Sequence, residues 1–363
     1  MSITISLCMI VKNEEDNLDA CLSTVYDIVD EINIVDTGST DKTVEIARKY
    51  TDRIFFFEWI NDFSAARNFS FSKATKEYIM WLDADDVIYE TDREKLKALK
   101  NSLNKKTDIV LMDYRYKKDE FGNIVINQKR ERLIKRSLGL KWSGRIHEGL
   151  PLEGKIFSSD IGIDHEHNKP DVSQKRNLQI LEEIIGTPEE TMKDLYYYAK
   201  TLYTEGEDDK ALPFFIKFVE LNKTHKLPAM DAYLALYYIY LKKQDYEKAY
   251  LVLAENDSLL NNYSEYYCSL GKFSSMLLKD YELAISYYNK ALKCTGADSS
   301  GEQMYTYSKY YYFTPYYALG GNYSELGKYT EAVNAYNKAL EYTLNHNETE
   351  EIRNKIRDIS RLI

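Results

Sequence analysis

The sequence predicts an α/β domain with a mostly parallel sheet, followed by an all-α domain of helical repeats. Short apolar runs rich in β-branched residues alternate with helix-like stretches in the first half of the chain. In the second half a block of sequence recurs, and only six of the 33 tyrosines precede residue 190. A chain of 363 residues is long enough to form a separate core in each domain.

Strands and helices are expected in alternation along the first half. The expected strands cover 3–10, 31–35, 53–57 and 78–82, and the expected helices cover 17–26, 41–50 and 63–74. This spacing predicts parallel strands joined by right-handed crossovers. Ligands of such sheets bind outside the carboxyl ends of the strands. Polar residues follow three of these strands, at Asn13 and Glu14, at Asp36, and at Asp83 and Asp85.

The domain boundary is expected at the segment Gly186-Thr187-Pro188-Glu189-Glu190. Glycine is typical of the end of a helix, threonine of an N-cap and proline of the first helical position. Glu190 would then complete a capping box with Thr187. We therefore expect one domain over residues 1–186 and a second over 187–363.

The second half contains a repeat. The block 280–292 recurs at 328–340, and weaker copies surround Ala211 and Ala249. The pattern resembles the tetratricopeptide repeat, whose unit is 34 residues. The last copy has residues typical of the first helix of that repeat at Tyr316, Leu319, Gly320 and Tyr323. The tyrosines are expected to pack between helices, and a helical array of this kind can bind a peptide or a second copy of the chain. A homodimer is therefore a further hypothesis.

Composition limits the classes of function. The net charge of −10 argues against a broad nucleic-acid-binding surface, and no segment is apolar enough over a sufficient length to span a membrane. The N-terminal apolar segment lacks the basic start and cleavage site of a signal peptide, so we interpret it as a strand. The four cysteines show no metal-binding or disulfide spacing. These features predict a cytoplasmic protein.

Three aspartates follow the fourth expected strand, at Asp83, Asp85 and Asp86. In an extended strand, residues i and i+2 point to the same side, so Asp83 and Asp85 are expected to share one hard cation. Mg²⁺ and Mn²⁺ sites use few carboxylates and leave room for substrate phosphates.

Four motifs in order carry a resemblance to a known family. They are Ser6 to Glu15, Ile34 to Asp41, Asp62 to Asn68, and the aspartates after the fourth strand. Together they resemble family 2 glycosyltransferases of the GT-A fold over roughly residues 3–170. With the repeats that follow, the chain is similar to the branch that includes bacteriocin S-glycosyltransferases.

The resemblance implies a pocket for a nucleotide-sugar donor, with Asp36 on the base or ribose and Arg67 neutralising the diphosphate. The pocket would be lined by Val11, Asn13, Glu14, Asp36, Arg67, Asp83 and Ala84. The alternatives are that Asp36 only forms the turn before Gly38 and that Arg67 is a surface arginine. Ser39, Thr40 and Asp41 are expected to cap the following helix.

The same resemblance implies Mn²⁺ or Mg²⁺ as the cofactor, held by Asp85, Asp83 and a late histidine. His165 matches that position best, His167 is a weaker candidate, and Asp86 need not bind the ion. The alternative is that His165 lies in the core beside Ile161 and Ile163.

The segment from Trp142 to Gly149 resembles the part of these enzymes that closes over the acceptor. Inverting transfer uses a base to take the acceptor proton, and Glu148 is the candidate. Trp142 and His147 would position the acceptor. Alternatively, Glu148 and His147 both only position it, and a thiol acceptor would need a strong base less than a hydroxyl would.

The leading hypothesis is an inverting, metal-dependent transferase that moves a hexose from a UDP-sugar, such as UDP-glucose or a relative, to a peptide, protein or glycan. One alternative is a non-catalytic scaffold with an inert front domain. Another is a dehalogenase-like phosphatase, whose DxDx[TV] motif fits Asp83 to Val87. In phosphatases of that kind, the strand before the motif is normally the first of its domain, whereas here the two motifs of the expected nucleotide pocket precede it.

Overall fold

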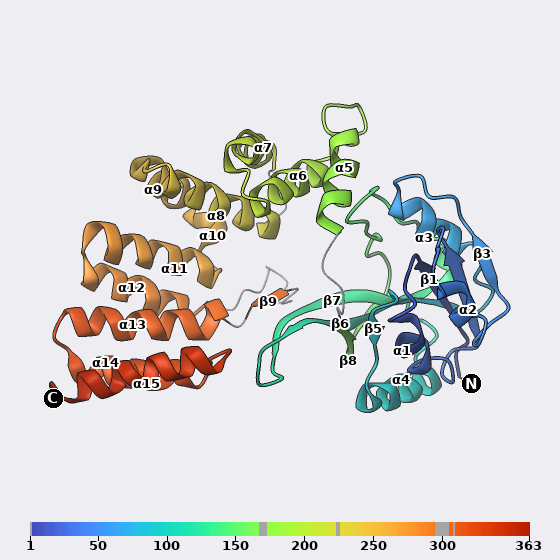
Figure 1. The fold of residues 1–363 in the computed structure, drawn as a ribbon, viewed down its shortest axis with the longest axis horizontal. Helices are drawn as coiled ribbons and strands as arrows, with labels where there is room; N and C mark the ends of the chain where they lie inside the picture. Colours follow the sequence, from blue (N-terminus) through green and yellow to red (C-terminus); the bar gives the residue numbers. More distant parts are fainter. Residues whose placement is uncertain (1, 167–172, 223–225, 295–304, 308) are drawn as a thin grey trace. The chain divides into compact units, whose positions relative to one another are not determined.

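The computed structural model describes residues 2–166, 173–222, 226–294, 305–307 and 309–363 (Figure 1). These residues form two compact units. The first comprises Met1–Tyr116 and Asn127–Glu183, and the second comprises Lys117–Ile126 and Ile184–Ile363. The longer segment of the second unit begins at Ile184, close to the expected boundary, whereas Lys117–Ile126 were expected to belong to the first domain.

A mixed sheet forms the centre of the first unit. Its strand order is β3-β2-β1-β4-β7-β6-β8-β5. The pairs β1–β2, β1–β4 and β2–β3 are parallel, as the βαβαβ spacing predicts. The pairs β4–β7 and β5–β8 are antiparallel. The strands are β1 Ile5–Val11, β2 Glu31–Asp36, β3 Ile54–Phe56, β4 Tyr78–Trp81, β5 Asp86–Val87, β6 Ile109–Lys118, β7 Ile124–Lys135 and β8 Ile156–His165.

Helices cover both faces of this sheet (Figure 1). A large apolar cluster on one face includes Leu18 and Leu22 of α1 and Leu96 of α4. A smaller cluster on the other face joins Phe71 of α3 to Trp81 and Trp142. The helical segments of this unit are α1 Leu18–Ser23, α2 Thr43–Ala47, α3 Phe63–Phe71, α4 Glu90–Ser102, the 3₁₀ turn Arg136–Leu138 and α5 Ser173–Ile184. The layered α/β fold predicted for the N-terminal half is confirmed.

The helix expected to begin at Thr187 begins later. α6 starts at Met192, and Thr191 is its N-cap in a capping box with Asp194. The side chain of Glu190 instead accepts from the backbone N–H of Gly186 and pairs with Lys217. The prediction for Thr187 and Glu190 was wrong because a second threonine with an acidic residue at N3 follows four residues later, and it satisfies more of the free helix donors.

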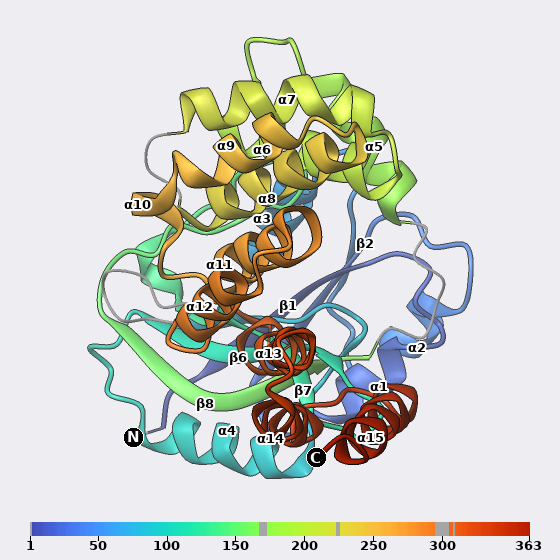
Figure 2. The same cartoon turned by 90° about the vertical axis from the view of Figure 1, so that its left-hand side faces the viewer.

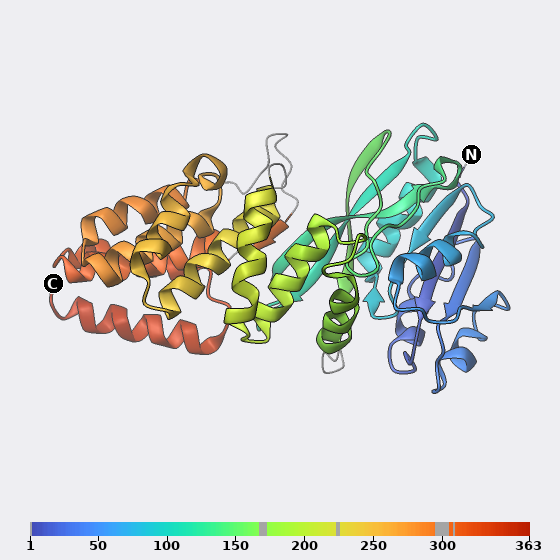
Figure 3. The ribbon, with the colours of Figure 1, turned by 90° about the horizontal axis from the view of Figure 1, so that it is seen from above.

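The second unit is a series of antiparallel helix pairs, α6/α7, α8/α9, α11/α12 and α13/α14, followed by α15. Figures 2 and 3 show these helices following one another in chain order. Their bounds are α6 Met192–Thr204, α7 Asp208–Leu221, α8 Lys226–Lys242, α9 Tyr246–Ala254, α10 Asp257–Leu260, α11 Ser264–Phe273, α12 Tyr281–Ala291, α13 Thr314–Glu325, α14 Tyr329–Leu340 and α15 His346–Ser360, with π-helical turns Ser274–Leu278 and Lys309–Phe313 and the short strand β9 Tyr305–Tyr307. The predicted helical-repeat architecture is confirmed.

The repeated small and aromatic positions pack within each pair. The four alanines aligned in the sequence are fully buried, at Ala211, Ala249, Ala284 and Ala332. Gly271 and Gly320 lie against the rings of Tyr288 and Tyr336, so closely that a Cβ atom would come within 2.8 Å of each ring. The prediction that tyrosines of the repeats pack between helices therefore holds at these positions.

Among the described residues, no helix combines the length and the apolarity that crossing a membrane would take.

Candidate active site

The acidic segment after β4 does not continue as a strand. β4 ends at Trp81, and the chain turns so that the N–H of Asp86 donates to the carbonyl of Asp83. The side-chain alternation of a strand therefore stops before Asp83. The strand geometry from which a shared side was predicted is therefore absent, and the two carboxylates have different partners.

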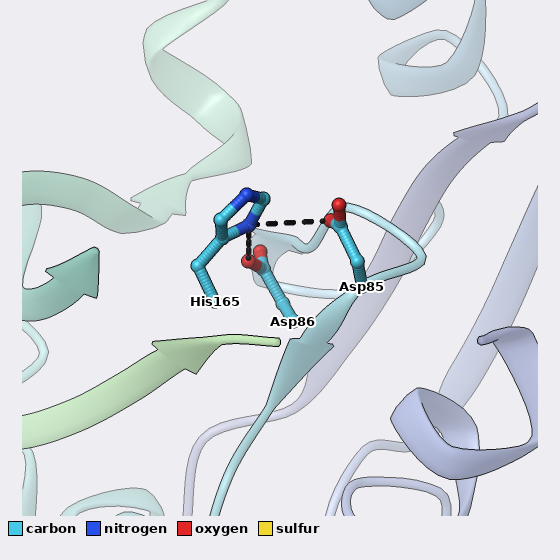
Figure 4. A group of neighbouring side chains, drawn as sticks. All are labelled: Asp85, Asp86 and His165. Atoms are coloured by element: carbon cyan, nitrogen blue, oxygen red, sulfur yellow. Dashed lines mark ion pairs between the residues drawn. The ribbon is translucent and has the colours of Figure 1, made fainter. Parts of the chain in front are cut away.

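Asp85, Asp86 and His165 form one cluster (Figure 4). The antiparallel pairing of β5 with β8 places Asp86 opposite His165. The Nδ1 atom of His165 lies 3.4 Å from Asp85 Oδ1 and 3.8 Å from Asp86 Oδ1. One ligand atom from each residue lies within 4.8 Å of the others, a spacing at which all three can contact one cation.

Asp86 is fully buried, and its two oxygens differ. Oδ2 accepts from Arg132 Nη1 at 2.8 Å and from the N–H of Asp83 at 2.9 Å. Oδ1 is buried and has no hydrogen-bond partner among the described residues. A buried carboxylate oxygen without a partner is costly. Two carboxylates and an imidazole are suitable donors for Mn²⁺ and acceptable ones for Mg²⁺, so this set fits a divalent cation.

His165 is held by two tyrosines from β6. The hydroxyl of Tyr114 lies 2.9 Å from its Nδ1 atom, and the ring of Tyr116 stacks on it at 4.9 Å. Burial alone would lower the pKa of His165, but the negatively charged carboxylates of Asp85 and Asp86 beside the ring raise it to about 10. The ring faces these carboxylates, so the alternative of an ordinary core histidine is wrong. His167 lies outside the described residues.

Arg67 joins a second pair of carboxylates. Its Nη2 atom lies 2.8 Å from Asp83 Oδ1, and its Nε atom lies 2.5 Å from Glu148 Oε1. The guanidinium also lies over the rings of Trp81 and Trp142, at 4.8 and 5.1 Å. Burial opposes its charge, but Asp83 and Glu148 outweigh burial and raise the pKa of Arg67 above its usual value. Arg67 is only 8% exposed, so the alternative of a surface arginine is wrong.

The segment that carries Glu148 is fixed to helix α3. The side chain of Asn68 donates to the carbonyl of Trp142 and accepts from its N–H. Ser143 and Gly149 form an isolated antiparallel bridge, and His147 adopts a positive φ of 51° between them. The indole Nε1 of Trp142 is buried without a hydrogen-bond partner among the described residues. The structure thus brings Arg67, Asp83, Glu148 and Trp142 together in one arrangement.

The ends of β1 and β2 form a third part of the same sheet edge. Val11 pairs with Asp36, and the Asp36 carboxylate accepts from the N–H groups of Gly38 and Ser39. Asp36 therefore makes the contacts expected from the alternative interpretation, in which it forms the turn before Gly38. Asn13 accepts from the N–H of Thr40 through its side chain.

Of the three expected caps, Asp41 binds the N–H of Thr43, the first residue of the next helix, whereas Ser39 and Thr40 bind Asn13 instead. Ser39 Oγ accepts from the N–H of Asn13, and Asp41 accepts from the N–H groups of Glu15 and Thr43. The N-cap of α2 is Lys42, which has no side-chain cap bond. These side chains instead connect the loop after β2 to the loop after β1. Val11 and Ala84, also expected to line the pocket, are buried.

Sequence reasoning missed Arg132, Tyr114 and Tyr116. Arg132 is fully buried in β7 and lies over the rings of Trp81 and Tyr114, at 3.8 and 4.5 Å. An arginine directly before the apolar pair Leu133-Ile134 was the available signal. A buried arginine needs a carboxylate partner, which here is Asp86.

Comparison with known proteins gives two family matches. Residues 6–156 match the model described as Glycosyl transferase family 2, and residues 264–294 and 314–346 match a tetratricopeptide repeat. The SPbeta prophage-derived glycosyltransferase SunS of Bacillus subtilis (strain 168) is 27% identical over 260 residues, which are 67% of this chain and 60% of that protein.

Two further matches are partial. A TPR repeat-containing protein of Synechococcus elongatus is 46% identical over 82 residues, 23% of this chain and 20% of that protein. The crystal structure of S. aureus TarS aligns with 69% of this chain and 55% of its own, with 14% identity and a TM-score of 0.39. In the match with SunS, the chain spans about 60% of the length of that protein. The segment that matches glycosyltransferase family 2, residues 6–156, precedes the segments that match the tetratricopeptide repeat, in the order that the sequence motifs predict.

Proposed function

We propose that this protein is an inverting glycosyltransferase that moves a hexose from a UDP-sugar to a peptide, protein or glycan acceptor, with Mn²⁺ or Mg²⁺ as cofactor. The single observation that carries the proposal is the cluster of Asp85, Asp86 and His165 at the carboxyl edge of the parallel strands. This edge lies within the segment that matches glycosyltransferase family 2. UDP-glucose or a related UDP-hexose is the proposed donor.

The divalent cation would be held by Asp85, Asp86 and His165. This set keeps two of the three ligands expected from the sequence and replaces Asp83 by Asp86. The support is the buried Oδ1 atom of Asp86, which accepts no hydrogen bond from the described residues and faces His165, together with the ion pair of Asp83 with Arg67. When bound, the cation would neutralise charge on the diphosphate of the donor.

Asn13, Glu14 and Asp36 would contact the nucleotide, since they follow β1 and β2 at the same edge as the acidic segment. Asp83 would bind the ribose or the sugar, and Arg67 would stabilise negative charge on the leaving diphosphate. The ion pairs with Asp83 and Glu148 fix the orientation of the Arg67 guanidinium before the donor binds.

Glu148 is the proposed base. Its Oε1 atom binds Arg67, which leaves Oε2 as the oxygen that would take the acceptor proton. Trp142 and His147 lie in the same short segment and would position the acceptor. The buried N–H of the Trp142 indole supports this role because it is a hydrogen-bond donor without a protein partner among the described residues.

A homodimer through the helical repeats remains part of the proposal, supported by the exposed apolar run of Met276, Leu277 and Leu278. We also propose a reducing, cytoplasmic location, which the four free cysteines support.

The proposal is tested by measuring UDP release from a panel of UDP-hexoses, with Mn²⁺, Mg²⁺ or EDTA and without acceptor. We expect slow, metal-dependent release from one donor, because water can replace the acceptor. If no donor is hydrolysed and calorimetric titration also shows no UDP binding, the proposed function is wrong. UDP binding without hydrolysis would instead indicate a strict requirement for the acceptor.

A further inference from the structure

The helical repeats contain a cavity that the transferase chemistry does not use. Its volume is about 380 Å³, within the range of small-molecule and side-chain binding sites. It is lined by residues of α6, α7, α8 and α11 and by Tyr310 of the π-helical turn Lys309–Phe313. The first helices of successive pairs are in contact here, α6 with α8 and α8 with α11. The cavity therefore lies entirely within the second unit.

A buried carboxylate stands in the wall of this cavity. Glu265, in the first turn of α11, is only 9% exposed, and its Oε2 atom is buried without a hydrogen-bond partner among the described residues. Leaving a buried carboxylate oxygen without a donor costs free energy that an apolar residue at this position would not. The stability of the helix pair alone therefore does not explain why a glutamate occupies this buried position.

The other charged groups of the cavity do not neutralise Glu265. Lys200 lies 2.7 Å from Asp231 Oδ2, and the hydroxyl of Tyr196 donates to the same oxygen at 2.5 Å. Lys200 is thus already paired with a carboxylate. The lining residues include two carboxylates, Glu265 and Asp231, and one cation, Lys200. Negative charge is therefore in excess in this cavity.

Aromatic rings form part of the remaining walls. Tyr203, Phe215, Tyr238 and Tyr310 line the cavity beside Glu265. Aromatic faces attract cations and pack well against the methylene stems of lysine and arginine. A carboxylate at the base of an aromatic wall thus matches a side chain with an apolar stem and a cationic end. The volume is larger than one such side chain needs, so the adjoining main chain can also enter.

We propose that this cavity binds a lysine or arginine side chain of a polypeptide, whose cationic end pairs with Glu265 while its stem packs against the tyrosines. The inference does not depend on the proposed transferase activity. If the acceptor is a polypeptide, the cavity would be a docking site for it, separate from the catalytic domain.

Methyl NMR of the full chain tests the proposal. Met230 lines the cavity and is 7% exposed, so a ¹³C-methyl-methionine label reports on it directly. The signal is assigned with Met230→Leu. The probes are acetyl-Ala-Xaa-Ala-amide tripeptides in which Xaa is lysine, arginine, norleucine or glutamate, together with n-butylamine as a free amine.

We expect the lysine or arginine tripeptide to shift the Met230 signal saturably, and the norleucine and glutamate tripeptides to bind at least tenfold more weakly. Equal binding of the norleucine tripeptide, or no saturable shift with either basic tripeptide, would overturn the proposal. Binding of n-butylamine as tight as that of the lysine tripeptide would overturn the assignment to a polypeptide. These comparisons use the wild-type chain and do not require a folded variant.

Glu265→Gln then tests the carboxylate itself, because it keeps the shape of the side chain and removes its charge. We expect at least a tenfold loss of affinity for the basic tripeptides. Glu255→Gln is the matched control, since Glu255 is exposed after α9 and does not line the cavity. The methyl signals of the other methionines report whether each variant is folded. Unchanged affinity in folded Glu265→Gln would refute the role of Glu265.

Discussion

Asp85 and Asp83 are two residues apart, yet they bind different partners. Asp85 lies beside His165, whereas Asp83 binds Arg67. The cation site that we propose therefore depends on Asp85 and His165 more than on Asp83. It also depends on Asp86, which the pairing of β5 with β8 brings to the same place.

We expect Asp85→Asn and His165→Asn each to weaken Mn²⁺ binding by about 10- to 100-fold, because each removes or weakens one direct ligand. Asp83→Asn should change the affinity less than either of these substitutions, because the Asp83 carboxylate pairs with Arg67 and is not a ligand in our proposal. Electron paramagnetic resonance of free Mn²⁺ measures the affinity without any substrate. Asp52→Asn, an exposed position, is the control. A large loss in Asp83→Asn with none in Asp85→Asn would contradict the assigned ligands.

Glu148→Gln separates proton transfer from donor binding. The amide cannot take a proton, so we expect metal-dependent hydrolysis of the donor to fall by about 10²- to 10⁴-fold. The affinity for UDP, measured by calorimetry, should stay within about threefold because Glu148 does not bind the nucleotide in our proposal. Hydrolysis at the wild-type rate would remove Glu148 as the base.

Most residues of this site could be predicted from the sequence, because acidic and basic residues next to the ends of predicted strands can be recognised there. The sequence could not reveal how they pair. The partners of Asp83 and Asp85 depend on where β4 stops, and no local signal marks Trp81 as its last residue. Arg132 and Tyr114 come from β7 and β6, whose contact with the acidic segment exists only in the folded sheet.

At the scale of elements, α13 and α14 show why the repeat pattern predicts their packing. Gly320 lies against the ring of Tyr336, and a Cβ at this position would be 2.8 Å from ring atoms. Gly321, one residue later in the same helix, would place its Cβ 3.6 Å from the Tyr336 hydroxyl, an ordinary contact. The two glycines thus differ in packing but share one helix.

We expect Gly320→Ala to destabilise the protein by about 1–3 kcal/mol, because the added methyl forces the tyrosine or the helix to shift. Gly321→Ala should be neutral or stabilise by about 0.5–1 kcal/mol through helix propensity. Urea denaturation followed by circular dichroism measures both changes. Equal effects of the two substitutions would show that the close approach to Tyr336 does not restrict position 320.

The helix boundaries were less predictable than the helices. The expected helix over 63–74 is present as Phe63–Phe71 with Asp62 as its N-cap, but the expected helix over 41–50 is reduced to Thr43–Ala47. There, Asp41 binds the N–H of Thr43 at the start of the helix and also that of Glu15, whereas Ser39 binds only the neighbouring loop, at the N–H of Asn13. Polar residues near a helix end can serve either purpose, and only the tertiary contacts decide between them.

At the scale of the whole molecule, Glu265 should make stability depend on pH. Burial and the charge of Asp231 raise the pKa of Glu265 from 4.5 to about 7, although a hydrogen bond with Tyr311 acts in the opposite direction. The folded chain therefore binds this proton more tightly than the unfolded chain. Its stabilising effect is full below pH 4.5 and is lost as the pH rises through 7.

We expect Glu265→Gln to remove this loss, so that its free energy of unfolding relative to wild type rises between pH 4.5 and 8 by up to about 3 kcal/mol. Denaturant titrations across that range measure the difference, with Glu255→Gln as the control. A difference between Glu265→Gln and wild type that does not change with pH would contradict the raised pKa of Glu265.

The central claim is that the N-terminal unit transfers a sugar from a nucleotide donor with the help of a divalent cation. The most direct measurement is UDP release from UDP-hexoses by the wild-type chain, Asp85→Asn and Asp52→Asn, each with Mn²⁺ and with EDTA. We predict release by wild type and Asp52→Asn with Mn²⁺, and none above background with EDTA or in Asp85→Asn. Equal release by wild type and Asp85→Asn, or release unaffected by EDTA, would contradict the account.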